Sequence, residues 1–233
     1  MMRYLGKIFV YFFCIYCFAS TTTHAQNDVP ARRSYIGIAG GIMNYGGYMQ
    51  PKSFTLSQIS GAGEIMYRYD VTTNFHVRAT GLVGWLQRSN QYVEGQTPDR
   101  SGYFQTGIAE LNILPEYDFL NITPDKQLRY QYKWTPYIYA GGGAFRMFHY
   151  KGQKVNAENV VVNTGIAHKW GADLRGGIGI KYVAAPGIQL FFEGEQRVLN
   201  RPIDFYQYSN SHYFSIMIGG IFSLQKIGSK NNW

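Results

Sequence analysis

The stretch KWGADLRGGIGIKYV, residues 169–183, decides the fold, because its residue types alternate with a period of two. In an extended strand, successive side chains point to opposite faces. One face is apolar and consists of Trp170, Ala172, Leu174, Gly176, Ile178, Ile180 and Tyr182. The other face is polar or small and consists of Lys169, Gly171, Asp173, Arg175, Gly177, Gly179 and Lys181. The pattern predicts one long strand with two chemically different faces.

Aromatic residues at both ends of the apolar face indicate contact with lipid. Trp170 and Tyr182 stand twelve residues apart, and at about 3.3 Å per residue the strand between them is roughly 40 Å long. A tilt near 45° reduces this to roughly 28 Å across the membrane, close to the apolar band of a transmembrane barrel. The stretch therefore predicts a strand of an outer-membrane β-barrel.

The composition agrees with an all-β membrane protein. Aromatic residues make up 17% of the chain and charged residues 15%, while the mean hydropathy is −0.22. A slightly negative mean excludes a helical membrane protein but suits strands with one polar face. The formal net charge is +8, yet the basic residues are scattered and form no basic helix or basic-aromatic cluster. We therefore expect no nucleic-acid partner.

The first 25 residues are predicted to be a secretory signal peptide. An apolar run, Ile8 to Ala19, follows Arg3 and Lys7 and precedes a small polar stretch. A transmembrane anchor is the alternative, but the run is shorter than the roughly 17 residues that a span requires. Residues 26–233 are expected to form a single barrel domain in the outer membrane of a Gram-negative bacterium.

Both cysteines, Cys14 and Cys17, lie inside the predicted signal peptide. The mature protein would therefore have no disulfide, no thiolate metal ligand and no nucleophilic thiol. We expect no cofactor, no metal and no small-molecule substrate.

Seven further stretches resemble residues 169–183 in their alternation, which predicts an eight-stranded antiparallel barrel. They are residues 34–45, 60–70, 74–87, 102–119, 134–149, 188–199 and 211–225. The connections alternate in length, as in bacterial outer-membrane barrels. Short turns at 70–74 and 184–187 predict the periplasmic end. The longer linkers 46–59, 88–101, 150–168 and 200–210 predict the extracellular end.

Two strands carry specific expectations. In the fifth strand, Tyr137, Tyr139, Phe145 and Met147 are predicted to face outward and Arg146 inward. In the fourth strand, Pro115 cannot donate a backbone hydrogen bond, so a bulge or a local break in pairing is expected there.

Charged residues on the inward faces predict an interior charge network. Its predicted members are Glu64, Arg68, Arg78, Glu110, Glu116, Arg146, Asp173, Arg175, Lys181, Glu193, Glu195 and Arg197. Eight strands enclose a space just wide enough for side chains, and buried charges require partners. We therefore expect a closed barrel filled by paired charges rather than an open pore.

Two segments resemble signature stretches of a known family. They are GIAGGIMNYGGYMQPK, residues 37–52, and TPYIYAGGGAFRMF, residues 135–148, and both are similar to the PorG-like outer-membrane proteins of type IX secretion systems. The resemblance implies an outer-membrane component that associates with the periplasmic ring proteins PorK and PorN.

The linker 121–133 is long for the periplasmic end and is the candidate docking segment for such a ring. Its basic and aromatic residues are Lys126, Arg129, Tyr130, Tyr132 and Lys133. A solvated turn, or attraction of the same charges to lipid phosphates, is the alternative explanation.

A generic structural barrel and a lipid A-modifying enzyme are the alternative functions. The enzyme would depend on His76, His149, His168 or His212, but no nucleophile motif accompanies them. The protein is therefore expected not to be an enzyme. The last predicted strand alternates apolar residues and resembles the signal that barrel-assembly machinery recognises, so this machinery is an expected partner during biogenesis.

Overall fold

The structure, a computed structural model, describes residues 33–46, 59–90, 102–122, 131–155, 161–164, 170–203 and 211–224. The predicted signal peptide lies outside these residues. No helix in the described part of the chain has the length and apolarity that a membrane crossing requires.

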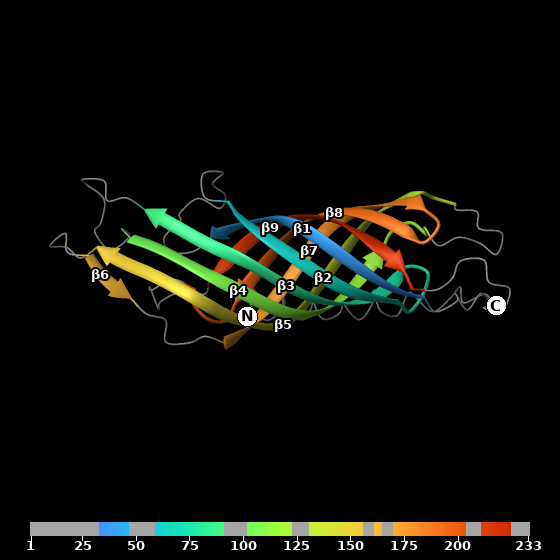
Figure 1. Cartoon of the computed structure of the whole chain (residues 1–233). Helices are drawn as coiled ribbons and strands as arrows, with labels where there is room; N and C mark the ends of the chain where they lie inside the picture. Colours follow the sequence, from blue (N-terminus) through green and yellow to red (C-terminus); the bar gives the residue numbers. More distant parts are fainter. Residues whose placement is uncertain are drawn as a thin grey trace, which may run out of the picture. The chain divides into compact units, whose positions relative to one another are not determined.

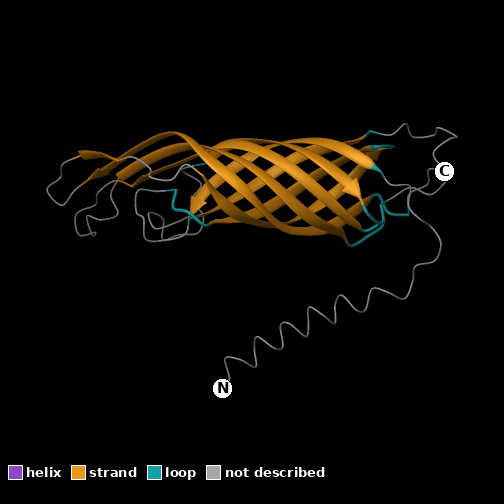
Figure 2. Cartoon of the chain, turned by 90° about the horizontal axis from the view of Figure 1, so that it is seen from below, coloured by secondary structure: helices purple, strands orange, loops and turns teal. Residues whose placement is uncertain are grey.

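The described residues form a closed antiparallel barrel. Its strands in chain order are β1 (Ser34–Gly46), β2 (Ser60–Asp70), β3 (Phe75–Asn90), β4 (Gly102–Asp118), β5 (Trp134–Val155), β7 (Trp170–Ala185), β8 (Ile188–Leu199) and β9 (His212–Ser223). Each strand pairs with its neighbour along the chain, β1 pairs with β9, and β4 with β5, so the ring has no free edge (Figures 1 and 2). The predicted eight-stranded barrel is confirmed.

A short additional strand, β6 (Val161–Thr164), pairs with the far end of β5 (Figure 1). This corrects the prediction that residues 150–168 are all linker, because β5 continues to Val155 before the chain turns back. The extension begins at a β-bulge: the register of β4 against β5 shifts between Gln105 and Gly107, and His149 opposite them has a φ of 49°. Such a bulge bends the strand where it leaves the barrel wall.

The two ends of the barrel differ in their connections. At one end, here called the turn end, lie the bend at 71–74, the tight turn before Ile188, the longer connection 119–133, the first residue of β1 and the last residue of β9. The Oγ1 atom of Thr72 accepts the backbone N–H of Phe75 at 2.9 Å, and Gly187 has a φ of 80°, a conformation that glycine adopts without strain. The opposite end, the loop end, carries the longer connections. By the rule for outer-membrane barrels, the turn end is periplasmic.

The outward face is apolar and exposed, as residues 169–183 predict. On β7, Leu174 is 69% exposed and Ile178 is 68% exposed, whereas Arg175 between them is 2% exposed. Aromatic residues bound this surface on β5 and β7: Trp134 lies opposite Tyr182 near the turn end, and Trp170, opposite Arg146, lies toward the loop end. The surface therefore matches a membrane-spanning band in chemistry and height.

The prediction for β5 is wrong, because its two faces are inverted. Tyr137, Tyr139, Phe145 and Met147 are all at most 4% exposed and point into the barrel. Arg146 is exposed on the outward face. Both faces of this strand carry apolar residues, so the aromatic character of one set does not by itself indicate lipid contact. The interior instead uses these large side chains as filling.

Pro115 interrupts the ladder as expected. Pairing of β4 with β5 stops at Ile113 and resumes at Glu116 in the same register, while Pro115 still lies opposite Val77 of β3. The prediction of a local break is confirmed, and no bulge accompanies it.

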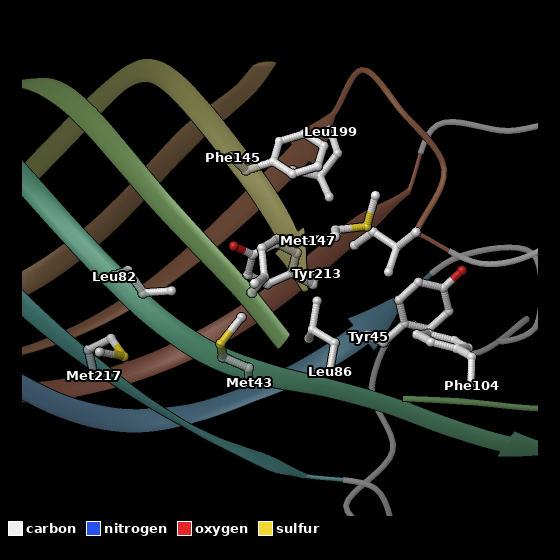
Figure 3. Close-up of a cluster of buried hydrophobic side chains, with 12 residues drawn as sticks. Met43, Tyr45, Leu82, Leu86, Phe104, Phe145, Met147, Leu199, Tyr213 and Met217 are labelled. Carbon is white, nitrogen blue, oxygen red and sulfur yellow. The ribbon is translucent and has the colours of Figure 1, made fainter. Parts of the chain in front are cut away.

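Buried apolar side chains fill the loop-end half of the interior (Figure 3). The cluster consists of Met43, Tyr45, Leu82, Leu86, Phe104, Ile108, Phe145, Met147, Leu199, Ile203, Tyr213 and Met217. Tyr45 and Phe104 meet edge to face with ring centroids 4.8 Å apart. The charged residues occupy the remaining half, toward the turn end, together with a smaller apolar cluster of Tyr35, Met66, Phe191 and Ile221.

Candidate functional site

The barrel interior is the main candidate site, since the predicted charge network gathers there. Eleven of the twelve predicted members are at most 4% exposed: Glu64, Arg68, Arg78, Glu110, Glu116, Asp173, Arg175, Lys181, Glu193, Glu195 and Arg197. Arg146 is the exception, because the inverted faces of β5 place it outside the barrel. Their alternation along the strands brings these eleven residues together from five of the barrel strands, β2, β3, β4, β7 and β8.

Near the turn end, a lysine is held between two carboxylates. Lys181 of β7 donates to Glu116 and, at 2.6 Å, to Asp118, both on β4. Arg68 of β2 approaches Glu116 at 3.5 Å and donates to Gln189 at 3.0 Å. Four strands, β2, β4, β7 and β8, are thereby joined across the interior by ion pairs and charge-assisted hydrogen bonds, and such hydrogen bonds are stronger than neutral ones.

His76 completes this group from β3. Its Nδ1 lies 2.8 Å from Asp70 and its Nε2 lies 3.2 Å from Asp118. His76, Glu116 and Asp118 have the ligand types and spacing of a metal site. However, the ammonium of Lys181 already lies between the two carboxylates, where a cation would bind. The cluster is therefore a set of internal ion pairs.

The centre of the network is organised around Arg175. Its guanidinium lies 2.6 Å from Glu64 and 2.6 Å from Glu195. Beside it, Arg78 lies 3.0 Å from Glu193. The Arg175–Glu64 and Arg78–Glu193 pairs connect opposite walls of the barrel, whereas Arg175–Glu195 joins the neighbouring strands β7 and β8.

Toward the loop end, Arg197 forms the last charged layer. It lies 2.9 Å from Glu110 and 2.7 Å from Glu195, and it donates to Ser215. The hydroxyl of Tyr213 donates to Glu110. Tyr213 also belongs to the apolar cluster, so its ring and hydroxyl join the two halves of the interior.

Two further tyrosines, both on β5, donate hydrogen bonds to carboxylates of the network. Tyr137 donates to Glu193 and Tyr139 donates to Glu195, each at 2.6 Å. The guanidinium carbon of Arg78 lies 4.3 Å from the centre of the Tyr139 ring, a cation-π distance. These aromatic side chains therefore fill volume and satisfy charge together.

Sequence reasoning missed three members of the network. Asp70, His76 and Asp118 are at most 5% exposed, and the alternation could have identified them: each stands two residues from a predicted member on the same strand. The twelve predicted members comprise six carboxylates and six cations, and the described interior does not keep this balance. Loss of Arg146 to the outside and gain of two aspartates leave more carboxylates than cations inside the described barrel.

The candidate docking residues lie partly outside the described residues. Lys126, Arg129 and Tyr130 are among those not described. Tyr132 is 40% exposed and Lys133 is also exposed, both at the turn end. The two described residues are thus accessible from the predicted periplasmic side.

The histidines do not gather into one site. His76 lies in the interior with two carboxylates, whereas His149 is exposed at the bulge and His212 is partly buried at the start of β9. His168 lies outside the described residues. The three described histidines therefore stand at different heights and do not form a common cluster.

A barrel filled in this way is expected not to conduct ions. Side chains occupy both halves of the described interior, and the charges in it are held by one another. The purified wild-type protein, inserted into a planar lipid bilayer, should give no steady single-channel current. Reproducible open-channel steps from the wild-type protein would contradict the closed interior.

Solved structures resemble this fold. The match to Neisserial surface protein A covers 81% of this chain and 96% of that protein, with 9% sequence identity and a TM-score of 0.51. The match to the outer membrane protein OprG from Pseudomonas aeruginosa covers 84% of this chain and 98% of that protein, with 10% sequence identity and a TM-score of 0.46. At such identities the likeness concerns the fold alone.

The fold and the exposed apolar band agree with the predicted location in the outer membrane of a Gram-negative bacterium. No curated protein is detectably similar to this chain in sequence. A family model does match, over residues 6–223, and the chain belongs to that family, described as domain of unknown function DUF6089.

Proposed function

We propose that this protein is a non-enzymatic outer-membrane component of a type IX secretion system, and that its turn end contacts PorK- and PorN-like periplasmic ring proteins. The observation that carries the proposal is the filled interior: Arg175, at the centre, is 2% exposed and bound on both sides by carboxylates. A barrel without an open interior meets other proteins through its ends. The resemblance of residues 37–52 and 135–148 to PorG-like proteins supplies the identity of the partner.

The turn end offers groups suited to such a contact. Phe119 and Trp134 are each 52% exposed, and Tyr132 is 40% exposed. Aromatic side chains contribute much of the affinity at interfaces, while exposed charges such as Lys133 orient the encounter.

The candidate linker is fastened to the barrel at both ends. The backbone N–H of Leu120 donates to Thr135 at 2.9 Å, Ile122 is 2% exposed, and the carbonyl of Lys133 accepts from Val183 at 2.7 Å. The segment between these anchors can therefore be exchanged without breaking the described contacts.

Replacing residues 123–130 by eight glycine and serine residues removes Lys126, Arg129 and Tyr130 while keeping the anchors. We expect the variant to insert normally but to retain ring proteins about tenfold less well, the scale of losing one important interface group. Co-purification from detergent-solubilised outer membranes and the amount of secreted type IX cargo are the measurements.

The matched control replaces residues 92–99, a predicted extracellular segment, by the same number of glycine and serine residues. This variant should retain the ring proteins at the wild-type level. Equal retention by both variants would show that the linker is not the docking site. If the wild-type barrel itself retains no ring protein, the type IX assignment fails and a structural barrel remains.

A further inference from the structure

A depression of about 620 Å³ lies on the lipid-facing side of the barrel. One small residue on each of four neighbouring strands, β2 to β5, forms its floor: Gly63, Gly81, Ala109 and Ala144. Larger apolar side chains flank it, among them Ile65, Val83 and Leu111. A Cβ added at Gly63 would meet no atom within 4 Å. The outer surface is hollowed here because the small residues of four adjacent strands lie close together.

A single arginine lies at one end of the depression. Among the described outward-facing strand residues from the turn end up to the level of Trp170, Arg146 is the one that carries a charge. Within the described part of the chain it forms no ion pair. Its guanidinium carbon lies 5.0 Å from the centre of the Trp170 ring, and both residues line the depression. The described part of the barrel therefore leaves this exposed guanidinium available to pair with an anion from outside the barrel.

The height of Arg146 matches the outer membrane interface. It stands twelve residues beyond Trp134, the aromatic residue at the turn end of the same strand. With about 3.3 Å per residue and a tilt near 45°, the two are roughly 28 Å apart across the membrane. This is the full apolar thickness, so Arg146 lies at the level of the outer-leaflet headgroups.

From Arg146 the depression descends into the apolar band. Arg146 lies opposite Ala109, Ala109 opposite Val83, and Val83 opposite Gly63. Because the strands are tilted, this row runs obliquely. Gly63 stands only seven residues from Asp70, the turn-end residue of its strand. With the same rise and tilt, Gly63 lies roughly 16 Å above the turn end of the barrel, measured across the membrane. The charged end therefore lies at the interface and the apolar end in the membrane core.

We propose that the depression binds one anionic lipid of the outer leaflet, a phosphorylated glycolipid of the lipid A class. Its phosphate accepts hydrogen bonds from the Arg146 guanidinium, whose planar fork suits a phosphate better than a point charge does. Trp170 keeps the guanidinium at the edge of the depression, and one acyl chain lies over Gly63 and Gly81. This lipid site is independent of the proposed secretion role, because it lies on the barrel wall rather than at the turn end.

Native mass spectrometry of the purified full-length barrel tests the site with lipid A and with the same lipid after removal of its phosphates. The wild-type protein should bind the phosphorylated form about tenfold more tightly, given the strength of charge-assisted hydrogen bonds. Arg146→Gln should abolish this preference, and Arg146→Lys should restore part of it. Lys151→Gln, which removes an exposed charge of β5 outside the depression, should leave the preference unchanged.

Gly63→Leu places a large side chain in the depression. Because a Cβ at this position meets no atom within 4 Å, the variant should fold. It should bind both lipids several-fold more weakly, because the leucine occupies the space of the acyl chain. The matched control is Gly194→Leu on β8, where the nearest atom to an added Cβ is 3.6 Å away; it should bind as the wild type does. Retained phosphate preference in Arg146→Gln would overturn the proposal, as would unchanged lipid binding in Gly63→Leu. A wild-type barrel that associates with a second copy and binds no lipid A would equally overturn it.

Discussion

Arg175→Met is expected to destabilise the folded barrel by about 3–5 kcal/mol, the cost of removing one partner from a buried ion pair. Arg175 is bound by Glu64 and Glu195, both at 2.6 Å, and donates to Thr80 at 3.0 Å. Methionine fills a similar volume, so the loss concerns charge more than packing. Equilibrium unfolding by urea in phosphatidylcholine vesicles, followed by tryptophan fluorescence, measures the change in the free energy of unfolding.

The same substitution on the outer face is the matched control. Arg146→Met also removes a guanidinium, but this one is exposed at the interface, where an arginine costs only about 0–1 kcal/mol. The double variant Glu64→Met with Arg175→Met should be more stable than Arg175→Met alone, because Arg175→Met leaves the buried Glu64 with only the 4.0 Å approach of Arg197. Two contacting residues typically couple by about 0.5–3 kcal/mol. Equal stabilities of Arg175→Met and Arg146→Met would show that the network does not stabilise the fold.

The barrel could be predicted from the sequence because lipid and interior make opposite demands on alternating residues. On β7 and β8 the inward charges alternate with outward residues that are mostly apolar, such as Lys181 between the exposed Ile180 and Tyr182. A charged side chain on the lipid face would be costly, so the pattern leaves one orientation. The two short turns, 70–74 and 184–187, then indicate which connections lie at the same end of the barrel.

The orientation of β5 could not be predicted in the same way. Its inward face carries Tyr137 and Tyr139, which resemble a lipid-facing aromatic set, yet their hydroxyls bond to carboxylates of β8, a strand about fifty residues further along the chain. Local sequence contains no sign of these distant partners. The rule that charges avoid lipid favours an inward Arg146, but this rule weakens at the membrane interface, where Arg146 lies beside Trp170.

Gly143→Ala is expected to prevent or strongly impair folding of the barrel. Gly143 faces inward on β5, directly opposite Asn112 of β4. A Cβ there would overlap the carbonyl oxygen of Leu111 and approach the Cα of Asn112. Main-chain atoms in a paired wall cannot rotate away as a side chain can. The cost should therefore reach or exceed the upper end of the about 1–3 kcal/mol typical of overpacking. Heat-modifiable migration in gels gives the folded fraction after refolding into vesicles.

Gly40→Ala provides the matched control, because it adds the same methyl group to β1, where no atom lies within 4 Å of the new Cβ. Gly40 is exposed on the outward face, so its replacement should change the free energy of unfolding by no more than about 0.5 kcal/mol. The two variants share composition and hydropathy and differ only in the space available. If Gly143→Ala refolds with the yield and stability of Gly40→Ala, the close approach of β4 and β5 at this point does not limit folding. A folding defect in Gly143→Ala but not in Gly40→Ala would show that the close packing of β4 against β5 limits folding. The alternation of residue types does not reveal this position.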